Sequence, residues 1–362
     1  MTRNTSSVTT ALQSLVRQAI ERDGGWLPFD RFMALVLYAP GLGYYANASR
    51  KFGAMPSSGS DFVTAPEMTP LFGKALAVQV ADAFEATGTN EVWEFGAGSG
   101  ALAVQLLQSL GERARRYHIV ELSASLRQRQ QEALRGFAPR VQWHDQLPAK
   151  FDGVVVGNEV LDAMPVKLLA RKDGDWFERG VAVHGEAFEW ADVATGLQPP
   201  VEGTHDYLTE IHPQAQAFVR TLADRLSRGA AFFIDYGFPE HEYYHPQRHM
   251  GTLMCHRAHQ ADTDPLSDIG LKDITAHVDF TSVALAAQDA GLATLGYTSQ
   301  GRFLINCGLV SMLEAASLQD RTAALRLLAE HEMGELFKVL ALHKDAAWEA
   351  VGFTTGDRSH TL

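Results

Sequence analysis

The feature that most constrains the fold is a strand-like run that passes directly into a glycine-rich turn and then a helix, over residues 91–102. Gly96, Gly98 and Gly100 allow a tight turn and let a ligand approach the backbone. The N-terminus of the following helix offers free N–H groups to an anionic group. Glu121 ends the next predicted strand, where a carboxylate accepts hydrogen bonds from ribose hydroxyls. These features together predict a site for an adenine-nucleoside cofactor.

Strand-like runs alternate with helical ones through the middle of the chain, which is typical of a parallel sheet with crossover helices. The predicted strands are 91–95, 117–121, 140–144, 153–156 and 231–235, and the predicted helices are 101–110, 123–135 and 213–227.

The flanking segments show other patterns. Apolar spacing predicts helices near 12–20 and 29–36, and a capping box at 64–67 predicts a helix that runs to about Ala86. Alternating residues predict an antiparallel insertion between 166 and 190, and 237–279 is rich in loop-forming residues. Towards the C-terminus we predict a helix at 281–290, a strand at 292–297, helices within 305–333 and a last strand at 336–343.

The glycine spacing alone leaves the identity of the cofactor open. Gly96, Gly98 and Ala101 satisfy the relaxed dinucleotide pattern, so an NAD(P)-dependent oxidoreductase is an alternative. Glu94 can hold the ammonium of an amino-acid-bearing cofactor, and Asp145 can accept the adenine amino group. Residues 1–90 precede the first strand, whereas a dinucleotide domain often starts a chain. In each of these features the chain resembles S-adenosyl-L-methionine (SAM) methyltransferases of the Rossmann-like class.

A second group of polar residues, Asn158, Glu159 and Asp162, follows the fourth strand. Because ligands bind at the carboxyl ends of strands in an open α/β sheet, these side chains should lie beside a bound methyl donor. Two carboxylates there can pair with a guanidinium and take up the proton that a methylated nitrogen releases. The simpler interpretation makes Asp162 a helix cap and Glu159 a solvated rim residue.

Composition narrows the range of partners. Asp and Glu number 43 against 31 Lys and Arg, a formal net charge of −12 that argues against a protein that follows nucleic-acid phosphates. The two cysteines, Cys255 and Cys307, are too few for a disulfide framework or a Cys-type zinc site. No apolar run approaches the ~20 residues of a membrane-spanning helix. The polar start predicts neither a secretory signal nor a transit peptide, so we expect a cytoplasmic protein without membrane insertion.

Several blocks in order span nearly the whole chain: GLGYY at 41–45, SDFVTAPE at 60–67, EFGAGSG at 94–100, NEVLDAMP at 158–165, IDYG at 234–237, GTL at 251–253, DITAHVDF at 273–280 and LFKVL at 336–340. Through these blocks the chain resembles the family of SAM-dependent methyltransferases that includes the mitochondrial complex I assembly factor acting as a protein arginine methyltransferase, with MidA-like relatives in bacteria. Ser60 departs from the family pattern, which has Gly before Asp-Phe.

The resemblance implies a Rossmann-like class I SAM-dependent methyltransferase core, an α/β fold with a mostly parallel seven-stranded sheet whose last strand is antiparallel. It implies a helical segment at 1–86, a core at 87–345 with insertions at about 167–205 and 238–280, and a C-terminal tail at 346–362. A bacterial cytoplasmic protein is expected rather than a mitochondrial one.

The resemblance also implies methyl transfer from SAM to an arginine of a basic protein, such as a subunit of NADH:ubiquinone oxidoreductase. Glu159 and Asp162 are the first candidates for binding the guanidinium, and His277 and Asp279 are the second. A SAM-binding assembly factor without catalysis is an alternative, and a homodimer is compatible with the sequence. The predicted cofactor-binding residues are Asp61, Phe62, Thr64, Glu67, Glu94, Gly96, Gly98, Gly100, Glu121, Leu122, Asp145, Gln146 and Asn158.

The histidine-rich segment suggests a metal site at first sight, but we predict none. His245 and His249 are spaced as ligands on one helix face, yet Pro246 and Gly251 argue against a helix there, and methyl transfer to nitrogen needs no metal. A lid over the acceptor site is the preferred interpretation, and an ordinary surface loop is the alternative. The segment contains His241, His245, His249, His256 and His259.

Overall fold

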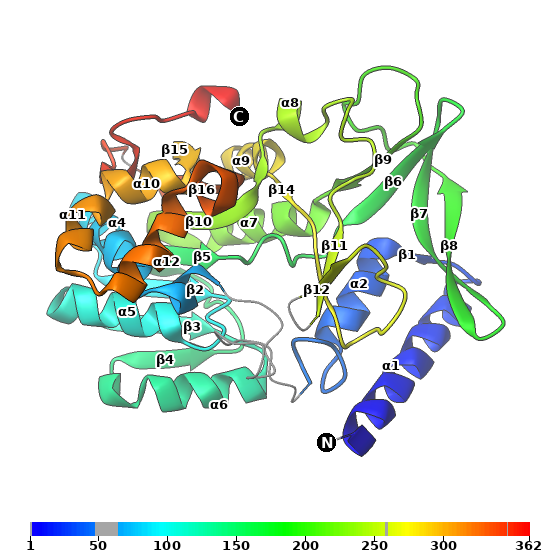
Figure 1. The fold of residues 1–362 in the computed structure, drawn as a ribbon, viewed down its shortest axis with the longest axis horizontal. Coiled ribbons are helices and arrows are strands. Elements are labelled where there is room, and N and C mark those ends of the chain that lie inside the picture. Colours follow the sequence, from blue (N-terminus) through cyan, green and yellow to red (C-terminus); the bar gives the residue numbers. More distant parts are fainter. Residues whose placement is uncertain (1, 48–63, 258–259, 346) are drawn as a thin grey trace.

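The centre of the larger lobe is a mostly parallel sheet, shown in Figure 1. The computed structural model describes residues 2–47, 64–257, 260–345 and 347–362. The strands of this sheet are β2 (Glu91–Phe95), β3 (Arg116–Val120), β4 (Val141–His144), β5 (Phe151–Asn158), β10 (Leu226–Phe238), β15 (Ala293–Ser299) and β16 (Phe337–Lys344). A short strand, β14 (Val278–Asp279), pairs with the end of β10.

The strand order is β15-β16-β10-β5-β2-β3-β4. β16 pairs antiparallel with β10 and with β15, and the other pairs along this path are parallel. Val154, Val155 and Val156 of β5 are fully buried, as expected for a central strand covered on both faces. The predicted α/β fold with an antiparallel last strand is confirmed.

Helices cover both faces of this sheet (Figure 1). Their buried side chains pack with those of the sheet in two separate hydrophobic clusters, one on each face. Phe72, Leu106 and Phe303 belong to one cluster, and Val219, Leu222 and Phe280 belong to the other. The first face carries α4 (Leu71–Thr87), α5 (Ala101–Leu110), α10 (Gln300–Asn306), α11 (Leu309–Met312) and α12 (Leu318–Leu328), and the second carries α7 (Pro213–Arg225) and α9 (Phe280–Asp289). Helix α6 (Ala124–Ala133) follows β3 and precedes β4 in the chain.

The helix predicted from the capping box to Ala86 is interrupted. A short helix, α3 (Ala65–Met68), ends at Thr69, which is extended, and α4 begins after Pro70. The cause is Pro70, because its ring disfavours a helical conformation of the residue before it. Thr64 occupies the N-cap position, but its side chain makes no capping hydrogen bond.

A small lobe combines segments that are far apart in the sequence (Figure 1). The N-terminal α1 (Thr2–Arg22), β1 (Leu27–Pro28) and α2 (Phe29–Tyr38) pack with an antiparallel sheet from the middle of the chain. Leu27 pairs with Val181 in that sheet. The sheet contains β1, β6 (Lys167–Lys172), β7 (Asp175–His184), β8 (Ala187–Ala194) and β9 (Tyr207–Ile211).

The segment predicted to be loop-rich, 237–279, contains regular structure. A sheet of β11 (Met254–Arg257), β12 (Gln260–Asp262) and β13 (Asp273–Thr275) belongs to the small lobe, whereas α8 (Glu240–Tyr243) packs against β10 and α9 of the larger lobe. Cys255 and Ile274 from this sheet share a hydrophobic cluster with Leu12, Phe32 and Val181. Residues 12–45 of the N-terminal segment therefore share one core with parts of both predicted insertions, whereas α3 and α4 pack on the main sheet. Among the described helices, none combines the length and the apolar content that a membrane span requires.

The close contact between β5 and β10 can be tested by substitution of Gly229. Gly229 has a φ of +143°, and a Cβ atom there would lie 1.8 Å from the carbonyl oxygen of Gly153. We expect Gly229→Ala to lower the free energy of unfolding by about 2–4 kcal/mol, measured by urea denaturation. Gly136→Ala is the matched control, because an added Cβ meets nothing within 4 Å there. Equal effects of the two substitutions would contradict the predicted clash.

Candidate functional site

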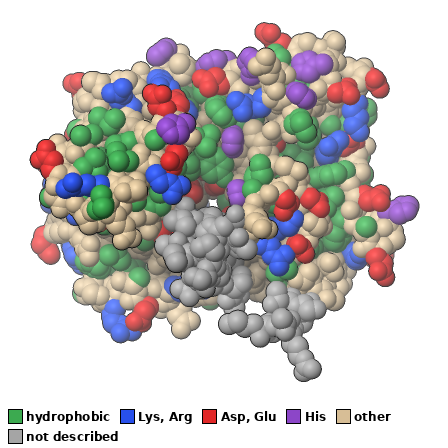
Figure 2. Space-filling model, viewed as in Figure 1, with side chains coloured by type: hydrophobic (Ala, Val, Ile, Leu, Met, Phe, Trp, Pro, Cys, Tyr) green, Lys and Arg blue, Asp and Glu red, His purple; other side chains and the backbone are tan. Residues whose placement is uncertain are grey.

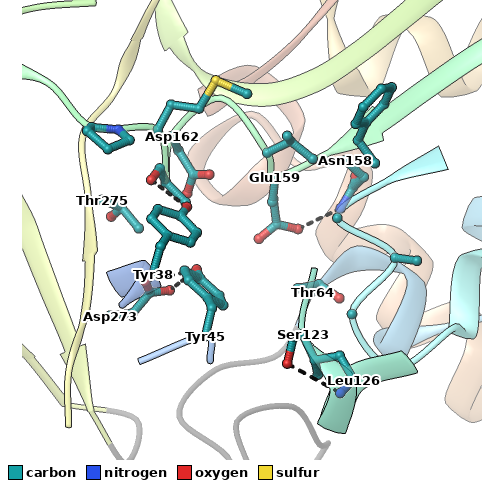
Figure 3. A pocket seen from close by; sticks show the side chains of 18 of the residues that line it. Tyr38, Tyr45, Thr64, Ser123, Leu126, Asn158, Glu159, Asp162, Asp273 and Thr275 are labelled. Carbon is teal, nitrogen blue, oxygen red and sulfur yellow. Dashed lines mark hydrogen bonds between the residues drawn. The ribbon is translucent and has the colours of Figure 1, made fainter. Parts of the chain in front are cut away.

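A cavity of about 1560 Å³ lies where the carboxyl ends of β2, β3 and β5 face the small lobe. Its wall on the sheet side includes the turn after β2, the end of β3 and the loop after β5. Its opposite wall includes Tyr38 and Tyr45 of the N-terminal segment and Asp273 of β13. Figure 3 shows these side chains surrounding an open centre.

The turn after β2 leaves room for a ligand because it consists largely of residues without bulky side chains. Gly96 has a φ of +67°, and a Cβ atom there would lie 2.6 Å from Cγ2 of Val160. Gly96 and Gly98 line the cavity, and the first turn of α5 directs free N–H groups towards it. Gly100 does not line the cavity. It is the N-cap of α5 and faces Gln130 and Ala133 of α6.

Glu121 is placed at the end of β3 as predicted, and two hydrogen bonds orient it. Its Oε1 accepts from the N–H of Ser123 at 2.8 Å, and its Oε2 accepts from Nε2 of Gln130 at 2.9 Å. The same Gln130 nitrogen donates to the carbonyl oxygen of Gly98 at 3.1 Å, so it links Glu121 to the glycine turn. Burial raises the pKa of Glu121. The neighbouring Leu122 lines the cavity with 78% of its surface exposed.

Asp145, which was predicted to accept the adenine amino group, lies outside the lining of the cavity. Neither Asp145 nor Gln146 lines the cavity. The exposed carboxylate of Asp145 accepts a hydrogen bond from Arg127 of α6. Spacing along the chain could not indicate this ion pair between Asp145 and Arg127.

Glu94 lies on β2 beneath the cavity and is buried, with 2% of its surface exposed. Its Oε2 accepts a hydrogen bond from the Tyr117 hydroxyl at 2.8 Å. Burial raises the pKa of Glu94 to about 8. Thr64 and Glu67 also line the cavity, whereas Asp61 and Phe62 fall outside the described residues.

The loop after β5 brings Asn158, Glu159 and Asp162 together at the cavity, as the sequence predicted. Glu159 adopts a left-handed conformation with φ of +53°, and its Oε1 accepts from Nδ2 of Asn158 at 2.9 Å. One carboxyl oxygen of Asp235 accepts the N–H groups of residues 160, 161 and 162, at 2.9–3.2 Å, and so holds the loop in this shape. Burial and the adjacent Asp162 raise the pKa of Glu159 to about 8.

Asp162 is 5% exposed, and its two carboxyl oxygens differ in their surroundings. Oδ2 accepts a hydrogen bond of 2.5 Å from the Tyr236 hydroxyl. Oδ1 is buried and has no hydrogen-bond partner among the described residues. Burial raises the pKa of Asp162 to about 6.

His277 lines the cavity, whereas Asp279 does not. The backbone N–H of His277 donates to Oγ1 of Thr252 at 3.0 Å, and Glu210 in turn accepts from both the N–H and the hydroxyl of Thr252. Burial, with Arg248 and Lys338 nearby, lowers the pKa of His277 to about 4. Asp279 instead caps α9, where its Oδ1 accepts the N–H of Ser282.

Other lining residues had no predicted role. Tyr38, Tyr45, Tyr236 and Asp273 all line the cavity. Tyr45, Tyr236 and Asp273 lie within the sequence blocks at 41–45, 234–237 and 273–280, which marked them as part of a pattern without indicating what they contact. The buried Glu210, which does not line the cavity, was likewise not predicted.

Of the histidine-rich segment, His256 lines the cavity, whereas His241, His245 and His249 do not, and His259 falls outside the described residues. In the described ranges, no three His, Cys, Asp or Glu side chains are grouped to hold a metal ion.

The charged side chains that line the cavity are mainly acidic. In the described part of the lining, the basic side chains Arg31 and Lys167 already pair with carboxylates, Arg31 with Asp23 and Lys167 with Asp30 and Glu178. On the outer face drawn in Figure 2, Asp and Glu are interspersed with Lys and Arg. The acidic lining residues are Asp30, Glu67, Glu94, Glu121, Glu159, Asp162 and Asp273.

Comparison with known proteins identifies the family. Residues 75–298 match the model of a family described as "putative S-adenosyl-L-methionine-dependent methyltransferase". The mitochondrial protein arginine methyltransferase NDUFAF7 of Danio rerio is 27% identical over 357 residues, which cover 85% of this chain and 80% of that protein. The corresponding homologue of Drosophila melanogaster is 28% identical, covering 91% of this chain and 86% of its own length.

A solved structure is similar along the entire chain. A Burkholderia thailandensis protein crystallised with S-adenosyl-homocysteine is 48% identical, with a TM-score of 0.94 and coverage of 100% of this chain and 99% of that chain. A second crystal structure from the same organism is 47% identical, with a TM-score of 0.90 and the same coverage.

The buried Glu94 predicts a pH dependence of stability. The unfolded carboxyl has a pKa of 4.5, and burial raises it to about 8 in the folded protein. As pH rises from 4.5 to about 8, the unfolded chain releases a proton that the folded protein retains, so stability falls. We expect the midpoint of thermal unfolding without cofactor to fall less between pH 6 and pH 9 in Glu94→Gln than in the wild type. The exposed Glu112→Gln should behave as the wild type, and an equally steep fall in Glu94→Gln would contradict the prediction.

Proposed function

Because this chain belongs to the family of S-adenosyl-L-methionine-dependent methyltransferases, we propose that it methylates arginine side chains of a protein partner. Its cofactor is SAM, which decides against the nicotinamide dinucleotide that the glycine spacing left open. The identity of the methyl acceptor is what we propose. The mitochondrial relatives, named protein arginine methyltransferases, support arginine, although they are only 27–28% identical to this chain.

One observation carries the proposal: Glu159 and Asp162 lie beside the glycine turn in a cavity whose lining is mainly acidic. A guanidinium is a planar cation with five N–H donors, and carboxylates accept these donors in pairs. Burying two carboxyl groups costs free energy unless a cation or hydrogen bonds compensate them. A bound guanidinium would supply both forms of compensation.

The residues on the sheet side fit the cofactor. The open turn at Gly96 and Gly98 allows close approach of the backbone, and Glu121 is oriented to accept hydrogen bonds from ribose hydroxyls. Glu94 offers a carboxyl group to an ammonium, and a cation beside it would favour its charged form. Thr64 and Glu67 close this side from the N-terminal segment.

The reaction needs orientation and a proton acceptor more than covalent catalysis. SAM supplies a methyl group bonded to a positively charged sulfur. A guanidinium nitrogen forms the new bond to the methyl carbon, the carbon–sulfur bond breaks, and the nitrogen loses one proton. Glu159 and Asp162 hold the guanidinium, and either carboxylate receives the proton before it passes to water. Because burial raises the pKa of both groups, each is a stronger base than an exposed carboxylate.

The partner and the compartment complete the proposal. In line with the family resemblance, we propose a protein with an accessible arginine, such as a subunit of NADH:ubiquinone oxidoreductase, as the substrate. We propose the bacterial cytoplasm as the location, and a homodimer is compatible with this proposal. Among the residues predicted as second candidates, His277 reaches the cavity and Asp279 serves as a cap, so we retain His277 alone near the acceptor.

Substitution of Glu159 tests the proposed activity. Methyl-labelled SAM is incubated with the protein and purified NADH:ubiquinone oxidoreductase, and methylarginine is measured by mass spectrometry after digestion. We expect Glu159→Gln to lower turnover at least ~100-fold, because a charged hydrogen bond and the proton acceptor are lost together. The exposed Glu112→Gln is the control. Methyl transfer to another residue type, or unchanged turnover in Glu159→Gln, would contradict the proposal.

The pKa values of the two carboxyl groups predict a pH profile. Only the deprotonated forms pair with a guanidinium, so kcat/KM for the acceptor at saturating SAM should rise from pH 6 and level off above about 8. In Glu159→Gln the rise should be confined to the region near pH 6, where Asp162 titrates. A wild-type profile that is flat between pH 6.5 and pH 8.5 would show that these groups do not control acceptor binding.

A further inference from the structure

The wall of the cavity that faces the glycine turn carries a pair of stacked tyrosines (Figure 3). The ring centroids of Tyr38 and Tyr45 are 5.5 Å apart, with 17° between the ring planes. The Tyr45 hydroxyl donates to the carboxylate of Asp273, at 2.9 and 2.8 Å from its two oxygens. The Tyr38 hydroxyl donates to the carbonyl oxygen of Ala163 at 2.8 Å. These bonds hold both rings in place before any ligand arrives.

The loop after β5 adds the carboxyl group of Asp162 to the side of the cavity that the tyrosines occupy in Figure 3. Asp162 receives one hydrogen bond, from Tyr236, at Oδ2. Its Oδ1 is buried and has no partner among the described residues, although Asp162 lines the cavity. A buried acceptor without a donor is costly, so this side of the cavity suits a ligand that donates hydrogen bonds. This observation is independent of the tyrosine pair and of Asp273.

The positions of these groups separate two functions within the cavity. In Figure 3, Tyr38, Tyr45, Asp162 and Asp273 lie on one side, Asn158, Thr64 and Ser123 lie on the other, and Glu159 lies between them. The second side continues into the glycine turn, which we assign to the cofactor. The first side is therefore left for the acceptor.

We propose that Tyr38, Tyr45, Asp162 and Asp273 form the subsite that selects an arginine side chain over other nucleophiles, a proposal that rests on the proposed function. A guanidinium is planar and weakly hydrated, so it stacks on an aromatic face while its edges donate to carboxylates. Tyr38 has 41% of its surface exposed and can present its ring to a ligand. The ammonium of lysine is a compact, strongly hydrated charge that gains less from a flat ring.

The test uses separate variants for the negative charge of Asp273 and for the aromatic ring of Tyr38. Asp273→Asn keeps an oxygen that can accept from Tyr45 but removes the negative charge. Tyr38→Leu removes the ring, and Tyr38→Phe keeps it without the hydroxyl. Asp289→Asn, at the exposed end of α9, is the matched control for the loss of one charge. Thermal unfolding and SAM affinity are measured for each variant, to confirm that folding and cofactor binding are retained.

With an acetylated and amidated Gly-Gly-Arg-Gly-Gly peptide, we expect Asp273→Asn and Tyr38→Leu each to raise KM about tenfold while kcat stays within about threefold. Asp289→Asn should remain close to the wild type, and Tyr38→Phe should raise KM less than Tyr38→Leu because it keeps the ring. The wild type should bind the arginine peptide at least about tenfold more tightly than the lysine counterpart, and Tyr38→Leu should reduce that preference. A merely structural role would not change the preference.

The outcomes distinguish this subsite from the proposed function. If the wild type methylates no arginine, the proposed function fails. The subsite is then judged by calorimetric binding of the arginine peptide to protein saturated with S-adenosyl-homocysteine. Weaker binding by Asp273→Asn than by the wild type supports the subsite, and no binding by the wild type overturns it. If arginine is methylated but KM is unchanged in both Asp273→Asn and Tyr38→Leu, only the subsite proposal is overturned.

Discussion

The site depends on one buried carboxyl group that receives the backbone N–H groups of the loop after β5. Asp235 of β10 accepts from residues 160, 161 and 162, and β10 is the parallel neighbour of β5. These bonds replace the hydrogen bonds that a continuing strand would have made, and so allow the chain to turn at Glu159 with a positive φ. As a result Glu159 and Asp162 both line the cavity. The chemistry of the site is therefore held by the register of two adjacent strands.

The small lobe converts one edge of the sheet into an enclosed site. A bare sheet edge would leave carboxylates in water, where their pKa values stay near those of free amino acids. Here Tyr38 and Tyr45, with Asp273 of β13, form the opposite wall, and burial raises the pKa of both Glu159 and Asp162. The lobe is assembled from the N-terminal helices and two later segments around one hydrophobic cluster, so the acceptor wall exists only when all three are folded together.

The sequence predicted the residues of the candidate site that are positioned by local geometry. It did not predict those that are positioned by packing between distant segments. The positions of Gly96, Glu121 and Glu159 follow from a strand ending at a known edge of a parallel sheet, and the structure places all three at the cavity. Asp145 and Asp279 also follow or accompany strands, but an ion pair with Arg127 and a capping bond to Ser282 direct them elsewhere. Such partners leave no regular spacing in the sequence. Glu210 accepts a hydrogen bond from Thr252, which in turn accepts one from the backbone of His277. The sequence did not predict this role of Glu210 for the same reason.

The sequence by itself determined the order of the strands in the main sheet, the glycine turn, and the carboxylates that follow β5, because each depends on residues close together in the chain. It also carried the family resemblance through blocks such as 158–165 and 273–280. Only the tertiary structure decided that residues 12–45 pack in one lobe with parts of both insertions, that Tyr45 pairs with Asp273, and that one oxygen of Asp162 has no partner among the described residues. A contact such as Tyr45 with Asp273 joins segments more than two hundred positions apart, and local patterns of apolar and polar residues do not encode how such segments pack.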